Sequence, residues 1–221
     1  MSVFQKLFTS GRIGKLELKN RIVMPPMATN FADPEGNVNE RHIAYYRRRA
    51  RGGAGLIIFE HTGIVRQGKA FPNMALIDSD ARIAKFKKLV QAVQDEGGKF
   101  FIQINHAGRQ TLSAYTGCPT VAPSPIPCPV RQETPKALSK EEIRDVVQLY
   151  REAARRAKEA GADGVEIHMA HGYLLNQFLS PFSNQRDDEY GGNLERRLRM
   201  PLEVLQAVRK KVGPDFPVTC R

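Results

Sequence analysis

The sequence predicts an α/β protein in which parallel strands alternate with helices, and it favours part of a (β/α)8 TIM barrel. Short apolar runs typical of buried strands alternate with amphipathic helical segments along the whole chain. Strands joined by helices in this way form parallel sheets with right-handed crossovers. A doubly wound sheet is the alternative, but Pro25 and Pro26 follow the first strand and no G-x-G-x-x-G turn is present. The barrel is therefore favoured.

Each element is predicted by its own local signals. A small hairpin is expected over residues 12–19, and strands are expected over residues 21–27, 55–60, 100–105, 164–168 and 216–220. Helices are expected over residues 39–51, 79–96, 139–160 and 193–212. A capping box from Ser139 to Glu142 opens the third helix, and Pro201 allows a kink in the fourth.

Residues 113–137 contain six prolines and are expected to form a long stiff loop without regular structure. The loop either covers a ligand or serves as a rigid connector. Five strands are fewer than the eight of a closed barrel. We therefore expect residues 1–221 to be the N-terminal part of a single barrel domain, strands one to five, with the remainder in a longer protein or in a partner.

Composition excludes several classes of protein. With 41% hydrophobic and 26% charged residues, the chain is neither collagen-like, disordered nor a disulfide scaffold. No apolar run approaches the ~18 residues of a membrane span. The three cysteines form no C-x-x-C pair, and the first residues lack a secretory pattern, so a cytoplasmic protein is expected. These cysteines are Cys118, Cys128 and Cys220.

The formal net charge is +11, which permits binding to nucleic acid or to an anionic ligand. The basic residues are spread over several predicted helices and alternate with apolar or acidic residues. No nucleic-acid-binding motif accompanies them. Solvated helix faces explain the charge better, so neither nucleic acid nor a membrane is expected as a partner.

The active site of such a barrel lies at the carboxyl ends of its strands, where polar inward-facing residues carry the chemistry. Alternation along the strands directs Phe100, Ile102 and Ile104 to the helices and turns Gln103 inward. The same rule turns His168 inward in the fourth strand. Both side chains are therefore expected at the same mouth of the barrel.

His168, His171 and Tyr173 follow the fourth strand within one short turn. Imidazole N–H groups stabilise negative charge that develops on a carbonyl oxygen, and a phenol delivers a proton. A purely structural role is the alternative for any one histidine, but the position at a strand end favours function. Zinc would need a third ligand, and no H-E-x-x-H is present, so no metal site is predicted.

Two further residues, Arg109 and His61, can each be interpreted in two ways. Arg109, after the third strand, binds an anion or forms an ion pair that stabilises its loop. His61 ends the second strand and is either part of the site or a surface histidine.

Four segments together resemble the Old Yellow Enzyme family of FMN-dependent NADH:flavin oxidoreductases. The resemblance covers essentially the whole chain and is closest to the branch of 2-enoate reductases and 2,4-dienoyl-CoA reductases. Its motifs are Asn20-Arg-Ile-Val-Met-Pro-Pro-Met27, Gln103-Ile-Asn-His-Ala-Gly-Arg109, the segment from His168 to Pro181, and Asp188-Glu-Tyr-Gly-Gly192.

The resemblance implies a (β/α)8 barrel with FMN at the carboxyl ends of the strands. The backbone of Pro25, Pro26 and Met27 would lie against the isoalloxazine ring, and Ala28 stands where relatives often have Thr or Cys. Gln103 would bond the flavin pyrimidine edge. His61 stands where relatives often have a small residue beside the flavin. Arg221 would stabilise the anionic reduced flavin.

The resemblance also implies the reaction. NADH or NADPH reduces FMN, and an α,β-unsaturated carbonyl or acyl compound then receives hydride at Cβ. His168 and His171 would hold its carbonyl oxygen, and Tyr173 would protonate Cα. An iron–sulfur cluster (4Fe-4S) and FAD belong to the family branch only where a longer C-terminal region exists. A homo-oligomer is expected.

Two alternatives remain at this stage. The chain is a truncated, non-catalytic barrel that needs a partner or a C-terminal half, or it is an FMN barrel dehydrogenase of another substrate class, acting on amines or thioesters.

Overall fold

The computed structural model describes residues 4–221, so part of the segment that lacks a secretory pattern lies outside the described residues. Five parallel strands form one sheet in the order in which they occur in the sequence. They are β3 (Val23–Met24), β4 (Leu56–Gly63), β5 (Lys99–Asn105), β8 (Gly164–Ile167) and β9 (Val218–Cys220). A doubly wound sheet would reverse its order, whereas this curled sheet continues in one direction, as barrel strands do. The predicted incomplete barrel is confirmed.

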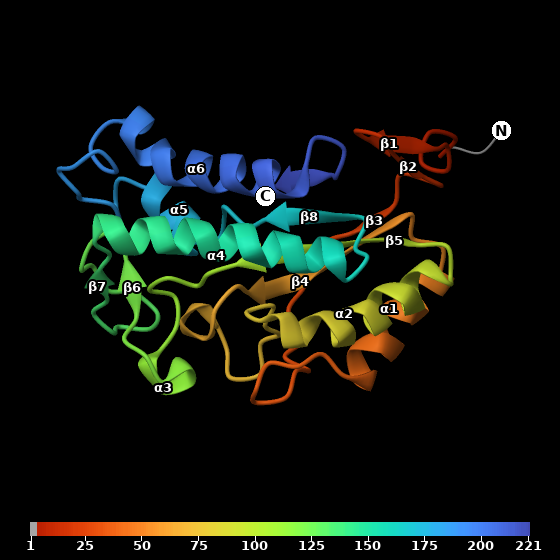
Figure 1. Cartoon of the computed structure of the whole chain (residues 1–221), viewed down its shortest axis with the longest axis horizontal. Helices are drawn as coiled ribbons and strands as arrows, with labels where there is room; N and C mark the ends of the chain where they lie inside the picture. The colour runs from red at the N-terminus through yellow and green to blue at the C-terminus, as the bar shows by residue number, and fades with distance from the viewer. Residues whose placement is uncertain (1–3) are drawn as a thin grey trace.

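Helices cover the outer face of the sheet (Figure 1). They are α1 (Glu40–Arg51), α2 (Ile83–Gln94), α4 (Lys140–Glu159) and α6 (Leu194–Val212). The expected capping box is present at α4, where Ser139 and Glu142 bond each other's backbone N–H groups. Asn193 caps α6 by accepting from Arg196 N, and Pro201 lies inside that helix.

Side chains alternate across the sheet as predicted. Phe100, Ile102 and Ile104 belong to the large core that the strands share with the helices. Phe101 belongs instead to a smaller cluster on the inner face. Because the period along a strand is two residues, this division fixes which polar side chains face inward.

A hairpin closes the N-terminal end of the inner face. Strands β1 (Gly11–Ile13) and β2 (Leu16–Leu18) pair antiparallel, as expected for residues 12–19. Buried Leu18 joins the inner cluster with Leu56 and Ile58 of β4. Figure 1 shows the hairpin at the end opposite to α3, β6 and β7. The other end is therefore left for the polar side chains.

The loop over residues 113–137 is more ordered than predicted. It contains the short helix α3 (Ser113–Thr116) and the paired strands β6 (Val121–Ala122) and β7 (Lys136–Ala137). The expectation of no regular structure was wrong because the prolines stand beside these elements and leave their backbone N–H groups free to pair.

Several boundaries also differ from the predictions. The first strand, Val23–Met24, ends at the proline pair as predicted, but it begins two residues later than Arg21. The second continues to Gly63 through an irregularity between Phe59 and Thr62. The 3-10 turn η1 (Arg66–Gly68) and helix α5 (Leu174–Leu179) were not predicted. The helix expected over residues 79–96 begins with a second 3-10 turn, η2 (Asp80–Arg82), before α2.

Across residues 4–221, no helix has both the length and the apolar character that a membrane crossing requires. The three cysteines are unpaired thiols, of which Cys128 is buried and Cys220 is exposed.

Candidate functional site

Three imidazoles and one phenol gather at the carboxyl end of the sheet. The ring centroid of His168 lies 5.0 Å from that of His171 and 5.1 Å from that of Tyr173. His61, from β4, lies 6.1 Å from His168 and 5.2 Å from Tyr173. The structure thus brings together all the residues predicted to be catalytic, and it adds His61 to them.

His168 follows β8 directly and is buried. Its Nδ1 accepts a hydrogen bond from the backbone N–H of Ala170 at 3.4 Å, so its Nε2 carries the hydrogen. This Nε2 lies 3.4 Å from Nδ1 of His171. Burial, with the neighbouring His61, His171 and Arg221, lowers the pKa of His168 to about 3. His168 is therefore a neutral donor at physiological pH.

His171 stands in a left-handed backbone conformation, with φ of 59°. Such a conformation costs a non-glycine residue about 1 kcal/mol and is common at functional sites. The turn is held by helix α5, whose Asn176 Oδ1 accepts from Gly172 N at 2.8 Å. Gln177 Nε2 donates to Gly172 O at 2.6 Å. Helix α5 thus fixes an exposed imidazole over the mouth.

Tyr173 is buried, and burial raises the pKa of its hydroxyl above the usual value. A hydrogen bond with Gln110 and the charge of Arg131 act in the opposite direction. The hydroxyl therefore keeps its proton at neutral pH, which suits a proton donor.

Gln103 lies on the inner face of β5 and bonds Glu166 of β8. Its Nε2 donates to Glu166 Oε1 at 2.8 Å, and Thr219 Oγ1 of β9 lies 3.4 Å from Glu166 Oε2. Burial raises the pKa of Glu166. Since the carboxylate takes one N–H of the amide, Oε1 and the second N–H of Gln103 remain for a ligand.

Arg221 follows β9, and its Nη1 lies 3.5 Å from the carbonyl oxygen of Pro26. The Arg221 side chain thus reaches from the end of the fifth strand to the segment that follows the first strand. Pro25, Met27 and Ala28 are exposed, and Pro26 is half-buried. No side chain covers this segment completely, so its backbone is accessible.

Glu60 anchors the segment that follows Ala28. The backbone N–H of Thr29 donates to Glu60 Oε2 at 2.5 Å, and the Thr29 hydroxyl donates to Oε1 at 2.6 Å. His42 Nε2 lies 3.2 Å from the same Oε1, and both His42 and Glu60 are buried. Through Thr29, Glu60 of β4 therefore fixes the end of the segment over residues 25–28.

The donor set at this mouth fits the pyrimidine edge of a flavin. That edge alternates carbonyl oxygens with an N–H group, and an amide offers both a donor and an acceptor to it. Gln103 has one of each free, and Arg221 offers a fixed cation beside the accessible backbone of residues 25–28. Gln103, Arg221 and the backbone of residues 25–28 thus fit FMN chemically.

Sequence reasoning missed three members of the site. Glu166 and Asn105 face inward by the alternation rule, which was a signal for both, but no role was given to either. Glu60 ends the apolar run from Leu56 to Phe59, and the pattern gave no partner for its carboxylate. Its role becomes visible only through Thr29 and His42.

Arg109 stabilises a loop, as one of its two interpretations held, but through carbonyl oxygens and not through an ion pair. Its Nη1 donates to the carbonyl oxygens of Ile126 and Pro127 at 2.9 and 3.1 Å, and it is buried. Arg109 therefore fastens the proline-rich loop rather than forming an ion pair. Within residues 4–221, no three His, Cys, Asp or Glu side chains are arranged to hold a metal ion.

A family model described as NADH:flavin oxidoreductase / NADH oxidase matches residues 6–221, so this chain belongs to that family. An NADH oxidase of Thermoanaerobacter brockii is 49% identical to it, over 100% of this chain and 34% of the relative. An NADPH dehydrogenase of Clostridium acetobutylicum is 45% identical, over 98% of this chain and 63% of the relative. An N,N-dimethylglycine/sarcosine dehydrogenase of Chromohalobacter salexigens is 40% identical, over 99% of this chain and 32% of the relative.

Solved structures agree. A 2-naphthoyl-CoA reductase in complex with 2-naphthoyl-CoA superposes with a TM-score of 0.95 at 32% identity, over 99% of this chain and 35% of the other. Morphinone reductase gives 0.92 at 36% identity, over 100% and 63%. The resemblance to the Old Yellow Enzyme family is confirmed. The chain spans between about a third and just under two thirds of the length of these relatives.

Proposed function

We propose that this chain serves an FMN-dependent oxidoreductase that uses NADH or NADPH to reduce the activated C=C bond of an α,β-unsaturated carbonyl or acyl compound. One observation carries the proposal. The neutral donor His168 lies between His171 and the phenol of Tyr173, at 5.0 and 5.1 Å, on the mouth that Gln103 and Arg221 also face. Family membership supports it.

Bound FMN would take hydride from the nicotinamide and return it to the substrate, so that two electrons pass to the C=C bond. Gln103 would hold the pyrimidine edge through its free Oε1 and N–H, and the backbone of Pro25, Pro26, Met27 and Ala28 would face the ring. Arg221 would balance negative charge on the reduced ring.

The two histidines would hold the substrate carbonyl oxygen. His168 Nε2 carries a hydrogen that points toward His171 Nδ1 over a long 3.4 Å contact. A carbonyl oxygen bound at the mouth would take this hydrogen bond in place of the long contact, together with one from His171. Since the turn and helix α5 fix both imidazoles, their N–H groups would stabilise the charge that develops as hydride reaches Cβ.

Tyr173 would complete the addition. Its phenol gives a proton to Cα while hydride arrives at Cβ, so the C=C bond becomes a single bond carrying two new hydrogens. The phenolate then regains a proton from solvent. Burial, which raises the pKa of Tyr173, keeps the proton available until the substrate is bound.

A second function has one observation in its favour, the 40% identity with the N,N-dimethylglycine/sarcosine dehydrogenase. In that case the substrate would be an amine that gives hydride to FMN. The phenol of Tyr173 would then have no carbon to protonate, so the two functions differ in the direction of electron flow at the same mouth.

One anaerobic experiment separates the functions. The FMN-loaded protein is mixed with NADPH or NADH, which should bleach the flavin band near ~450 nm. Addition of 2-cyclohexenone should restore the band and yield cyclohexanone, whereas cyclohexene, which lacks the carbonyl, should not. Bleaching of the oxidised protein by dimethylglycine, without recovery by the enone, would instead favour the dehydrogenase. A protein that retains no FMN would favour a truncated, non-catalytic barrel.

A further inference from the structure

His61 lies face to face with the proposed proton donor. Its ring and that of Tyr173 are stacked, with centroids 5.2 Å apart and an angle of 25° between the planes. His61 comes from β4 and Tyr173 from the turn before α5, so the contact joins two distant segments. Both side chains are buried. The stack therefore restricts where the phenol ring can lie.

Two neighbours hold His61 itself. Asn105 Nδ2 lies 3.1 Å from His61 Nδ1, and with the amide in this orientation it donates to the ring. Phe71 packs edge-on against His61 at 5.3 Å. Burial lowers the pKa of His61 to about 4. The imidazole is thus a neutral ring, fixed at one nitrogen and on one edge.

We propose that His61, fixed by Asn105, is a positioning residue that sets the place of the Tyr173 hydroxyl relative to Cα of the substrate. The inference rests on the proposed function, because it gives His61 a task only if Tyr173 delivers the proton. It differs from the expectation that His61 lies beside the flavin as a cofactor contact. The imidazole of His61 packs between Phe71 and Tyr173, and it therefore restricts the position of the phenol ring.

The physical reason is that the rate of proton transfer depends steeply on the distance between the donor and the acceptor atom. A displacement of about 1 Å at a reacting group can cost up to about a hundredfold in rate. The ring of Tyr173 also contacts His168 edge-on, with ring centroids 5.1 Å apart and an angle of 72° between the planes. The stacked ring of His61 covers a face of the phenol. Without that cover the ring gains freedom to tilt.

A double-mutant cycle on the FMN-loaded protein tests the inference. The rate at which 2-cyclohexenone reoxidises the reduced flavin is measured for wild type, His61→Ala, Tyr173→Phe and the double variant. We expect His61→Ala to slow this step about tenfold when Tyr173 is present and less than about twofold in the Tyr173→Phe background. Reduction by NADPH and the bound FMN content should stay unchanged in His61→Ala.

An equal loss in both backgrounds would overturn the inference, and so would a loss of NADPH reduction that matches the loss in the enone step. If His61→Ala purifies without flavin, His61→Phe replaces it, since it keeps a ring but cannot bond Asn105. A loss confined to the Tyr173 background is again expected. A Tyr173→Phe variant with the wild-type enone rate would instead refute the proton-donor role in the proposed function.

Discussion

Glu166 gives the mouth a negative charge next to the residues that would face the flavin. Its carboxylate accepts from Gln103 at 2.8 Å. Burial raises the pKa of Glu166, and the hydrogen bond from Gln103 and the charge of Arg221 act in the opposite direction. A carboxylate in this place has two consequences. It fixes which end of the Gln103 amide is free, and it offsets part of the positive charge of Arg221.

Replacement of Glu166 by Gln should therefore shift the reduction potential of bound FMN upward. Loss of the negative charge leaves Arg221 free to stabilise the anionic reduced form, and about 30 mV corresponds to about 1.4 kcal/mol for a two-electron couple. Equilibration with a reference dye during anaerobic reduction measures the shift. Thr219→Val, which removes only a weak partner of the carboxylate, is the matched control and should change the potential little. A lower potential in Glu166→Gln would refute this role.

For single residues, the sequence predicted which face of the sheet a side chain lies on better than it predicted which residues that side chain contacts. Period-two alternation correctly turned Gln103 and His168 inward, because a strand leaves no other choice. The stack of His61 on Tyr173 could not be predicted in this way. It depends on how far β4 extends past its irregularity and on helix α5, whose short length gave no periodic signal.

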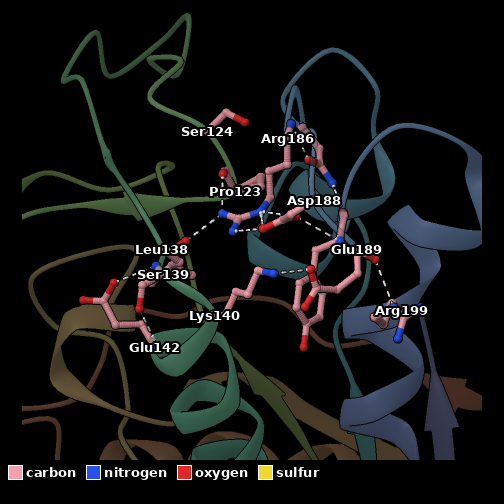
Figure 2. Close-up of polar contacts among 12 residues, drawn as sticks. Pro123, Ser124, Leu138, Ser139, Lys140, Glu142, Arg186, Asp188, Glu189 and Arg199 are labelled. Carbon is pink, nitrogen blue, oxygen red and sulfur yellow. Dashed lines mark hydrogen bonds and ion pairs between the residues drawn. The ribbon is translucent and has the colours of Figure 1, made fainter.

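Arg186 joins two loops at the carboxyl end of the sheet (Figure 2). Its guanidinium holds Asp188 through both carboxylate oxygens, with Nη2 2.6 Å from Oδ2. The same side chain donates to the carbonyl oxygens of Pro123 and Leu138 at 3.0 and 2.6 Å. The planar fork of arginine suits this set of acceptors. The proline-rich loop is thus tied to the segment that follows α5.

Arg186→Met should lower the free energy of unfolding by about 3 kcal/mol, because it leaves a carboxylate and two carbonyl oxygens without their donor. Urea denaturation measures the loss, and limited proteolysis should show faster cleavage within residues 123–138. Lys140→Met is the control, since the exposed Lys140–Glu189 pair should contribute little. Unchanged stability and proteolysis in Arg186→Met would show that the loop is held by other contacts.

Elements with strong local signals were predicted well, and those without them were not. The caps at Ser139 and Asn193 depend only on neighbours in the sequence, and both are present. The strands β6 and β7 pair only two residues each across the proline-rich loop. Arg186 and Arg109 bond carbonyl oxygens of this loop, and no local pattern predicts those contacts.

Among the described residues, burial lowers the pKa of three histidines, which are therefore neutral at physiological pH. Burial lowers the pKa of His61 and of His106 to about 4 and that of His168 to about 3. Unfolded histidine titrates near ~6.5, so between that pH and the folded values only the unfolded state binds the protons. The contribution of these histidines to the free energy of unfolding is therefore fully present above about pH 7 and is lost as the pH decreases.

At pH 5.5 each of these histidines should cost about 1.4 kcal/mol of stability relative to pH 7.5. Chemical denaturation of the flavin-free protein at the two pH values measures the sum. His106→Asn removes one titrating group outside the proposed site and should reduce the difference by about a third. A His106→Asn protein with the full pH dependence would show that His106 does not contribute to it.

The arrangement of the whole sheet was the most predictable feature. Sequential parallel strands, the absence of a glycine-rich turn and a polar carboxyl end together imply a barrel. The hairpin that closes the opposite end was predicted as an element, but not its packing on Leu56 and Ile58. That contact joins residues far apart in the chain, which pattern alone does not specify.

The measurement that tests the central claim most directly is the reoxidation of NADPH-reduced flavin in Tyr173→Phe. With 2-cyclohexenone as the acceptor, the rate should fall by about a hundredfold or more, because the proton donor for Cα is lost. Reduction by NADPH and reoxidation by ferricyanide, which needs no proton at carbon, should keep their wild-type rates. Reoxidation by the enone at the wild-type rate would contradict the assignment of Tyr173 and, with it, the chemistry proposed for this mouth.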